Sequence, residues 1–263
     1  KYSPAVAVAK TAHKLGLDRL LNKSGILPEQ SKQLSQFLPR LKNSHKIDEL
    51  NEVNKAKGEL FLLKGCMGEA LDSTTLSNAI KLLKLLGYTV NTPKEQKCCG
   101  AIHRHQGDIS SSEDMLDTNG SLISHKRYDA VIGTSSACIA HFKEHIHERN
   151  THNTPIMDIV TFLANQDWSD IPFENQPTRI GIHEVCSNRN LLKDSNSIKE
   201  LFSHFNWIDA QPLAGNSHCC GAGGTHMIKN PEQTVLLRQS RIEQIKREKI
   251  DTVVSQNLSS TID

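Results

Sequence analysis

Two short sequence words recur in this chain: Lys97-Cys98-Cys99-Gly100-Ala101 and His218-Cys219-Cys220-Gly221-Ala222. A lone cysteine stands roughly thirty residues before each word, Cys66 before the first and Cys186 before the second. The chain has only 7 Cys and 15 Gly among its 263 residues, so composition alone does not account for two Cys-Cys-Gly triplets. The recurrence indicates two related units, each of which brings thiols together.

The distance between the two copies is nearly constant along the chain. Cys66 and Cys186 are 120 residues apart, and Cys98 and Cys219 are 121 residues apart. Residues 128–132 align with residues 250–254 at an offset of 122. We therefore expect an internal duplication, with the polar, proline-bearing stretch 165–177 between the two halves.

Apolar runs that predict strands alternate with longer periodic segments that predict helices. Strands are expected at 60–63, 88–90, 128–132, 179–183 and 251–255, and helices at 76–86, 134–147, 196–205 and 231–249. This alternation predicts an α/β fold made of two Rossmann-like β/α halves with parallel sheets. The expected parts are a short helical connector (1–57), a first cysteine-rich half (58–165) and a second cysteine-rich half (178–263).

Charge and hydropathy exclude several classes of function. The formal net charge is +2 and comes from mixed charges rather than a basic run, so no nucleic-acid surface is expected. No apolar stretch approaches the ~20 residues that cross a bilayer. Four of the seven cysteines form adjacent pairs, which suits metal-bound thiolates in a reducing compartment better than disulfides.

The first cysteine set comprises Cys66, Cys98, Cys99 and Cys138. Each lies near the end of a predicted strand, and the carboxyl ends of parallel strands share one edge of a sheet. Four thiolates complete an iron–sulfur or a zinc site. The usual zinc ribbon pairs its ligands as CxxC knuckles, and the only close pair here is adjacent, so the spacing favours an iron–sulfur cluster, with structural zinc as the alternative.

The second cysteine set comprises Cys186, Cys219 and Cys220, with His183 as a candidate fourth ligand. Three thiolates and one imidazole suit zinc, or a cluster with an imidazole or open coordination position; the alternative is an empty site kept for packing. Gly100 and Gly221 are expected to leave backbone room beside the ligands. His103 and His105 are expected to tune the first cluster by hydrogen bonding. Four further histidines are expected at the surface: His141, His145, His147 and His152.

These motifs resemble the cysteine-rich CCG domain of the heterodisulfide reductase B subunit and of iron–sulfur subunits of flavin-linked 2-hydroxyacid dehydrogenases. The likeness is closer to the glycolate oxidase iron–sulfur subunit and its lactate-utilisation relatives. It rests on the segments 65–66, 98–108, 135–138, 183–186 and 219–225 and covers about residues 59–263.

The resemblance implies an iron–sulfur electron-transfer subunit of a glycolate- or lactate-type dehydrogenase, with a [4Fe-4S] cluster on the first cysteine set and zinc or a second cluster on the second. It implies a FAD-containing dehydrogenase subunit as electron donor and a quinone or other carrier as acceptor. The expected compartment is the cytoplasm, or the inner face of the membrane through the complex. The alternatives are a heterodisulfide-reductase-like catalytic subunit that binds substrate sulfur at an open iron, and a structural zinc protein; no catalytic residue is predicted.

Three departures from the family pattern limit what carries over. No cysteine follows Cys220, and Ser260 stands where the last ligand of the second set is expected. Ser135 and His141 flank Cys138 where the heterodisulfide reductase type has a second thiolate, which favours an ordinary cluster over a five-thiolate one. The C-x₂-C-x₂-C-x₃-C-P run of ferredoxin modules is absent, so such modules are expected either before Lys1 or on another chain.

Overall fold

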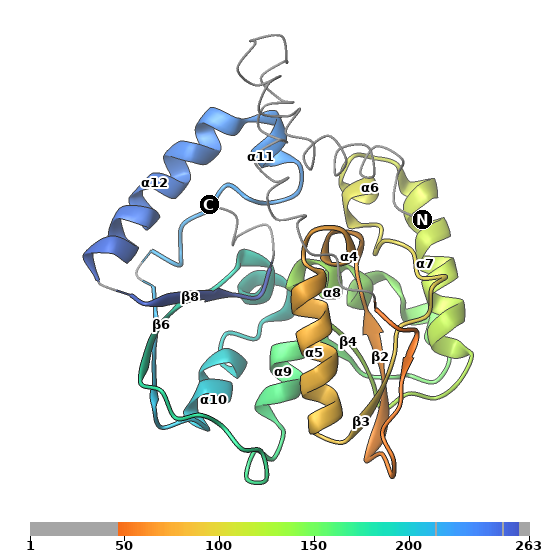
Figure 1. The fold of residues 1–263 in the computed structure, drawn as a ribbon. Helices are drawn as coiled ribbons and strands as arrows, with labels where there is room; N and C mark the ends of the chain where they lie inside the picture. Colours follow the sequence, from red (N-terminus) through yellow and green to blue (C-terminus); the bar gives the residue numbers. More distant parts are fainter. Residues whose placement is uncertain (1–46, 214, 249, 258–263) are drawn as a thin grey trace, which may run out of the picture.

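The computed structural model describes residues 47–213, 215–248 and 250–257. Its strands form two sheets, with the orders β1-β3-β2-β4-β5 and β7-β6-β8 (Figure 1). The first sheet contains β1 (Leu50–Asn51), β2 (Gly58–Leu63), β3 (Tyr88–Asn91), β4 (Ala130–Gly133) and β5 (Ile156–Asp158). The second contains β6 (Thr178–His183), β7 (Ile208–Pro212) and β8 (Thr252–Ser255). All pairings are parallel except that of β1 with β3.

Helices connect these parallel strands, as the predicted α/β fold requires. They are α4 (Cys66–Leu71), α5 (Ser73–Leu85), α6 (Ala101–His105), α7 (Ile109–Ser124), α8 (Ser136–His145), α9 (Ile159–Ala164), α10 (Ser197–Ser203), α11 (His226–Lys229) and α12 (Pro231–Arg247). A 3-10 turn η2 (His147–Arg149) and a π-helical turn η3 (Asn188–Leu192) complete the order. None of the helices in the described ranges combines the length and apolar character needed to cross a lipid bilayer.

The central strand β2 is buried on both faces, as expected for a parallel sheet covered by helices. Leu60 and Leu62 pack in one core cluster with residues of α5 and α9. Phe61 and Leu63 point to the opposite face and pack in a second cluster with residues of α7 and α8. The apolar run of β2 therefore supplies both cores of the first half.

The predicted duplication is confirmed in strand order and register. In each half the first strand is central, the second pairs on one side and the last on the other, giving β3-β2-β4 and β7-β6-β8. Leu60 pairs with Val90, and Ile180 pairs with Ala210, both pairs at an offset of 120 residues.

Equivalent side chains fasten the carboxyl ends of the two central strands. The side-chain amide of Gln96 accepts a hydrogen bond from the Lys64 N–H (3.0 Å) and donates one to the Leu62 carbonyl (3.0 Å). In the second half, the side-chain amide of Asn216 accepts from the Glu184 N–H (3.2 Å) and donates to the Ile182 carbonyl (2.9 Å). Gln replaces Asn between the halves, but the side-chain amide and its two backbone partners are kept.

At the amino-terminal ends of these strands, an aspartate accepts a backbone hydrogen bond in each half. Asp129, just before β4, accepts from the Glu59 N–H at 2.6 Å. Asp251, just before β8, accepts from the Arg179 N–H at 3.0 Å. Each carboxylate therefore satisfies a backbone donor that would otherwise have no partner at the edge of the ladder.

The helical prediction for residues 1–57 is wrong where the structure describes them. Residues 47–57 carry β1, which pairs Leu50 with Asn91 on β3, while residues 1–46 lie outside the described residues. The Thr92 N–H adds a hydrogen bond to the Glu49 carbonyl (2.6 Å), so this segment continues the sheet. Strands β5 and β7 were not predicted either, because they are short and have few fully buried residues.

Buried polar contacts join the two halves. The Ser136 and Ser187 hydroxyls are 2.8 Å apart, and the Ser136 N–H donates to the Gln256 carbonyl (3.0 Å). Gln256 in turn donates to Asp158 (3.4 Å), whose side chain is 1% exposed. Burial raises the pKa of Asp158 to about 7, so this carboxyl group holds a proton over most of the acid range.

We expect Asp158→Asn to gain stability relative to the wild type as the pH rises from 5 to 8. The folded wild type keeps the proton on Asp158 up to a pKa of about 7, whereas the unfolded chain releases it near pH 3.8. The folded state thus binds more protons in this window, and its stability falls as pH rises. Asparagine can still cap α9 and carries no ionisable group. Urea unfolding of both proteins at the two pH values measures the effect. A stability difference between the variant and the wild type that does not change with pH would contradict the raised pKa of Asp158.

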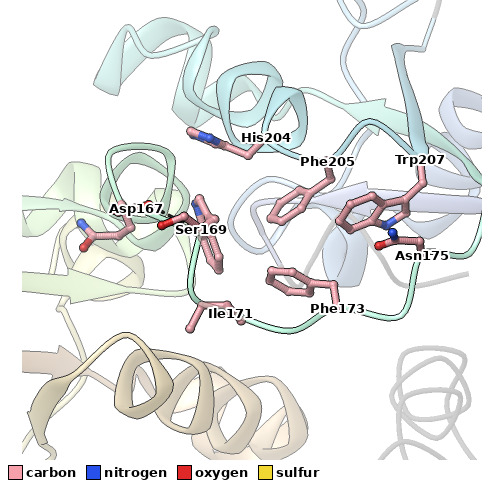
Figure 2. A pocket seen from close by; sticks show the side chains of 10 residues that line it. Asp167, Ser169, Ile171, Phe173, Asn175, His204, Phe205 and Trp207 are labelled. Atoms are coloured by element: carbon pink, nitrogen blue, oxygen red, sulfur yellow. Dashed lines mark hydrogen bonds between the residues drawn. The ribbon is translucent and has the colours of Figure 1, made fainter.

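An aromatic cluster packs the segment that links the halves against the start of β7. Phe205 is its centre, with ring centroids 4.9 Å from Phe173, 5.4 Å from Trp168 and 5.5 Å from Trp207. Figure 2 shows the rings of Phe173, Phe205 and Trp207 gathered around one pocket. The pocket has a volume of about 520 Å³, and Trp168 also lines it. The pocket lies beside the residues that precede β6 and β7, at the amino-terminal edge of the second sheet.

Truncation within this cluster should cost stability in proportion to burial. Phe205→Ala removes a ring that is 9% exposed and is expected to lower the free energy of unfolding by about 3 kcal/mol. Phe173→Ala removes a ring that is 39% exposed and should cost clearly less. Chemical denaturation of both variants tests this. An equal decrease in the free energy of unfolding in both variants would show that Phe205 is not the centre of the packing.

Candidate metal centre

The carboxyl edge of the first sheet brings the first cysteine set together. Cys66 begins α4 directly after β2, Cys98 and Cys99 lie in the loop between β3 and α6, and Cys138 lies in α8 after β4. Because β3, β2 and β4 are parallel neighbours, these segments meet at one end of the sheet (Figure 1). The aromatic pocket, at the amino-terminal edge of the second sheet, takes no part in this site.

The four thiols lie close to one another. The sulfurs of Cys66 and Cys98 are 3.3 Å apart, within hydrogen-bond distance. Cys98 also lies close enough to Cys99, and Cys99 to Cys138, for each thiol to shift the pKa of its neighbour. Cys66 is exposed, Cys98 and Cys138 are half-buried, and Cys99 is 2% exposed. The first cysteine set is thus one continuous cluster that reaches from the core to the surface.

The pKa values of these thiols move in opposite directions because the groups share protons. The hydrogen bond from Cys66 lowers the pKa of Cys98, and the same bond raises the pKa of Cys66. The interaction between Cys99 and Cys138 raises the pKa of Cys99 and lowers that of Cys138. Four adjacent thiolates are unfavourable without a compensating cation. Metal binding would remove this conflict by displacing the thiol protons.

Glycines leave room at the ligand loops. Gly65, before Cys66, has φ +66°, and a Cβ there would lie 3.9 Å from the Cys138 sulfur. Gly100 has φ +87°, and a Cβ there would lie 2.7 Å from the Ser112 hydroxyl. Gly221 occupies the equivalent place in the second half, with φ +75° and Thr234 in the place of Ser112. The positive φ and the close helix together favour glycine after each cysteine pair.

Asn119 orients the ligand loop, and the sequence analysis missed it. Its side chain is fully buried in α7; it accepts from the Lys97 N–H (3.0 Å) and donates to the carbonyls of Lys97 (3.2 Å) and Cys98 (3.1 Å). The only sequence signal is a polar residue on the apolar face of α7, a helix that the sequence analysis did not predict. Arg241, 122 residues later in α12, donates to the His218 carbonyl (2.8 Å) in the equivalent way.

The histidines of the first half are placed differently from one another. His103 lies 3.0 Å from Asp108 and is close enough to Cys98 to help lower the pKa of that thiol. His105 instead faces His141, with ring centroids 6.3 Å apart. His141 was expected at the surface but is 5% exposed, because it points inward from α8. His145 is partly exposed, and His147 and His152 lie in the exposed turn that follows.

The described residues contain no group of three His, Cys, Asp or Glu side chains already arranged around a single metal ion. Thiolates that surround zinc tetrahedrally are ~3.8 Å apart, given Zn–S bonds of ~2.3 Å. The Cys66 and Cys98 sulfurs are closer than this, as hydrogen-bonded thiols are. The donor chemistry fits a thiophilic metal centre, and binding would separate the sulfurs.

The second cysteine set is more open. Cys186 and Cys219 are exposed and Cys220 is partly exposed. The Cys219 sulfur accepts from the Gly221 N–H (3.3 Å), but within the described ranges no hydrogen bond joins Cys186 to the pair. Ser260, at the position equivalent to Cys138, lies outside those ranges.

His183 ends β6 and is 4% exposed. Burial, and then the positive charge of Arg241, lower its pKa to about 4, so its imidazole is neutral at physiological pH. A neutral imidazole is the form that binds metals. The structure therefore places a competent donor near the second cysteine set but shows no contact between them.

Comparison with known proteins gives the same division of the chain. Residues 61–143 and residues 180–259 each match the family described as CCG, cysteine-rich domain. The probable glycolate oxidase iron-sulfur subunit of Bacillus subtilis (strain 168) is 24% identical over 272 residues, which cover 96% of this chain and 61% of that protein. The chain thus spans less than two thirds of that relative.

Two further relatives match smaller parts of the chain. Lactate utilization protein A of Geobacillus thermodenitrificans is 24% identical over 206 residues, covering 74% of this chain and 85% of that protein. An uncharacterized iron-sulfur protein of Methanocaldococcus jannaschii is 22% identical over 236 residues, covering 89% of this chain and 46% of that protein. With both halves matched and both carrying the repeated motif, this chain belongs to the CCG cysteine-rich domain family.

Proposed function

We propose that the chain is the iron–sulfur electron-transfer subunit of a flavin-linked 2-hydroxyacid dehydrogenase of the glycolate or lactate type. The observation that carries the proposal is the connected set of four thiols at one sheet edge. The named iron–sulfur relatives support it. Cys66, Cys98, Cys99 and Cys138 hold one cluster, of the [4Fe-4S] type. Such a cluster, when bound, accepts and releases one electron at a time.

The residues of the first half prepare this centre. Cys98 already favours the thiolate form, the pKa of Cys138 is lowered by its contact with Cys99, and Cys66 and Cys99, whose pKa values are raised, lose their protons on binding. Asn119 holds the backbone of the ligand loop and so fixes where Cys98 lies. Burial of Cys99 shields one side of the site from water, while exposure of Cys66 brings the other side to the surface. A surface ligand shortens the path for electrons to and from a partner.

We propose for this complex the partners that the resemblance of the cysteine motifs implies. A FAD-containing dehydrogenase subunit donates the electrons, and a quinone or other carrier accepts them. Ferredoxin-type modules in the same complex would extend the path between the two. We place this complex in the cytoplasm or on the inner face of the membrane.

The second half has a supporting role in this proposal. Cys186, Cys219 and Cys220 with His183 offer three thiolates and one imidazole, a donor set for zinc or for a second cluster. Because its cysteines share no hydrogen bond in the described ranges, we assign the electron-carrying centre to the first cysteine set.

Alanine variants of the two cysteine sets test the assignment. We expect Cys138→Ala to lose about four irons and four acid-labile sulfides per chain, because it removes one of the four ligands to the electron-carrying cluster. Cys186→Ala, the control from the second cysteine set, should keep them. After reduction with dithionite, the control should transfer electrons to decylubiquinone as the wild type does, and Cys138→Ala should not.

The measurements are iron and sulfide content and the rate of quinone reduction on anaerobically purified proteins. If Cys138→Ala keeps its iron and its quinone reduction, the first cysteine set is not the redox centre. If the reduced wild type instead transfers electrons to a disulfide and not to quinone, the electron-transfer role is wrong and the reductase alternative is supported.

A further inference from the structure

Three imidazoles gather beside α8, on the face that also carries Cys138 about one turn earlier. His141 and His145 are four residues apart, so they lie on the same face of the helix, with ring centroids 4.6 Å apart. His105, the last residue of α6, is the third member, 6.3 Å from His141. Two separate helices thus bring nitrogen donors to one place.

His141 has an unexplained buried polar atom. Its side chain is 5% exposed, and its Nε2 has no hydrogen-bond partner among the described residues. A buried nitrogen without a partner costs free energy. Burial also lowers the pKa of His141 to about 4, so the ring is neutral and one nitrogen lone pair is available. A metal ion would give this atom the partner that it lacks.

The surrounding charges are compatible with a cation. The Glu144 carboxylate lies 3.7 Å from the Nε2 of His145. Arg104 is the nearby positive group, and Glu113 compensates its charge at 2.6 Å. His145 has a side chain that is 23% exposed, and His105 is exposed, so an ion can enter from solvent.

We propose that His141, His145 and His105 form a binding site for a divalent transition-metal ion of the Zn²⁺ class, whose protein ligands are the three imidazoles and none of the cysteines. Imidazoles are favoured ligands of such ions, and a His pair at i and i+4 on a helix is a spacing that binds zinc. The described residues do not yet surround a common point, so the site closes by rotation of the more exposed His145 and His105 onto His141. Water completes the coordination.

Zinc titration calorimetry on the protein with its cysteines and any cluster intact tests the proposal. The variants are His145→Gln, His105→Gln and the matched control His147→Gln, which removes an exposed histidine just outside the trio. All four proteins have the same seven cysteines, so thiol binding is common to them. Circular dichroism checks the fold of each.

We expect the wild type and His147→Gln to bind one more zinc ion than His145→Gln, or to bind it about tenfold or more tightly. His105→Gln should show a smaller loss, and because His105 is exposed it serves as the test if His145→Gln does not fold. Equal zinc binding by His145→Gln and the wild type would overturn the proposal. An equal loss in His147→Gln and His145→Gln would also overturn it, since this would indicate unspecific binding by surface histidines.

Discussion

Parallel pairing of β2 with both β3 and β4 is the constraint on which the cysteine cluster depends. It places the ends of three strands side by side, so residues as far apart in sequence as Cys66 and Cys138 come close enough for Cys138 to shift the pKa of Cys66. The apolar run of β2, buried on both faces, fixes the pairing because a slip in register would disrupt two cores at once. The ligand geometry is thus set by the packing of the sheet rather than by the loops alone.

The two halves share one framework but differ in the side chains around their cysteines. Register, strand-end carboxylates and the glycine after each cysteine pair are retained. The residue that hydrogen-bonds the backbone of the ligand loop is Asn119 in the first half and the cationic Arg241 in the second. The last residue of the central strand is the apolar Leu63 in β2 and His183 in β6. In the first half, Cys98, Cys99 and Cys138 pack in an apolar core cluster, whereas the second half has His183 at the end of its central strand and Arg241 at the ligand loop. This difference agrees with a single electron-carrying centre in the first half.

Much of the fold could be predicted from the sequence because its signals are local and repeated. The apolar runs and the constant offset give the parallel halves, and the positions of Cys66 and Cys98 relative to strand ends predict their convergence. Other features depend on tertiary contacts that no local pattern records. The burial of His141 needs the packing of α6 against α8, the role of Asn119 needs the approach of α7 to the ligand loop, and β1 forms only because β3 offers an open edge.

The central claim is that the first cysteine set holds a redox-active iron–sulfur cluster. The most direct measurement is the iron, acid-labile sulfide and zinc content of anaerobically purified protein, with EPR spectra before and after dithionite. A single [4Fe-4S] cluster predicts about four irons and four sulfides per chain and a signal that changes on reduction. Zinc without sulfide, and no reducible signal, would contradict the claim and identify a structural metal protein.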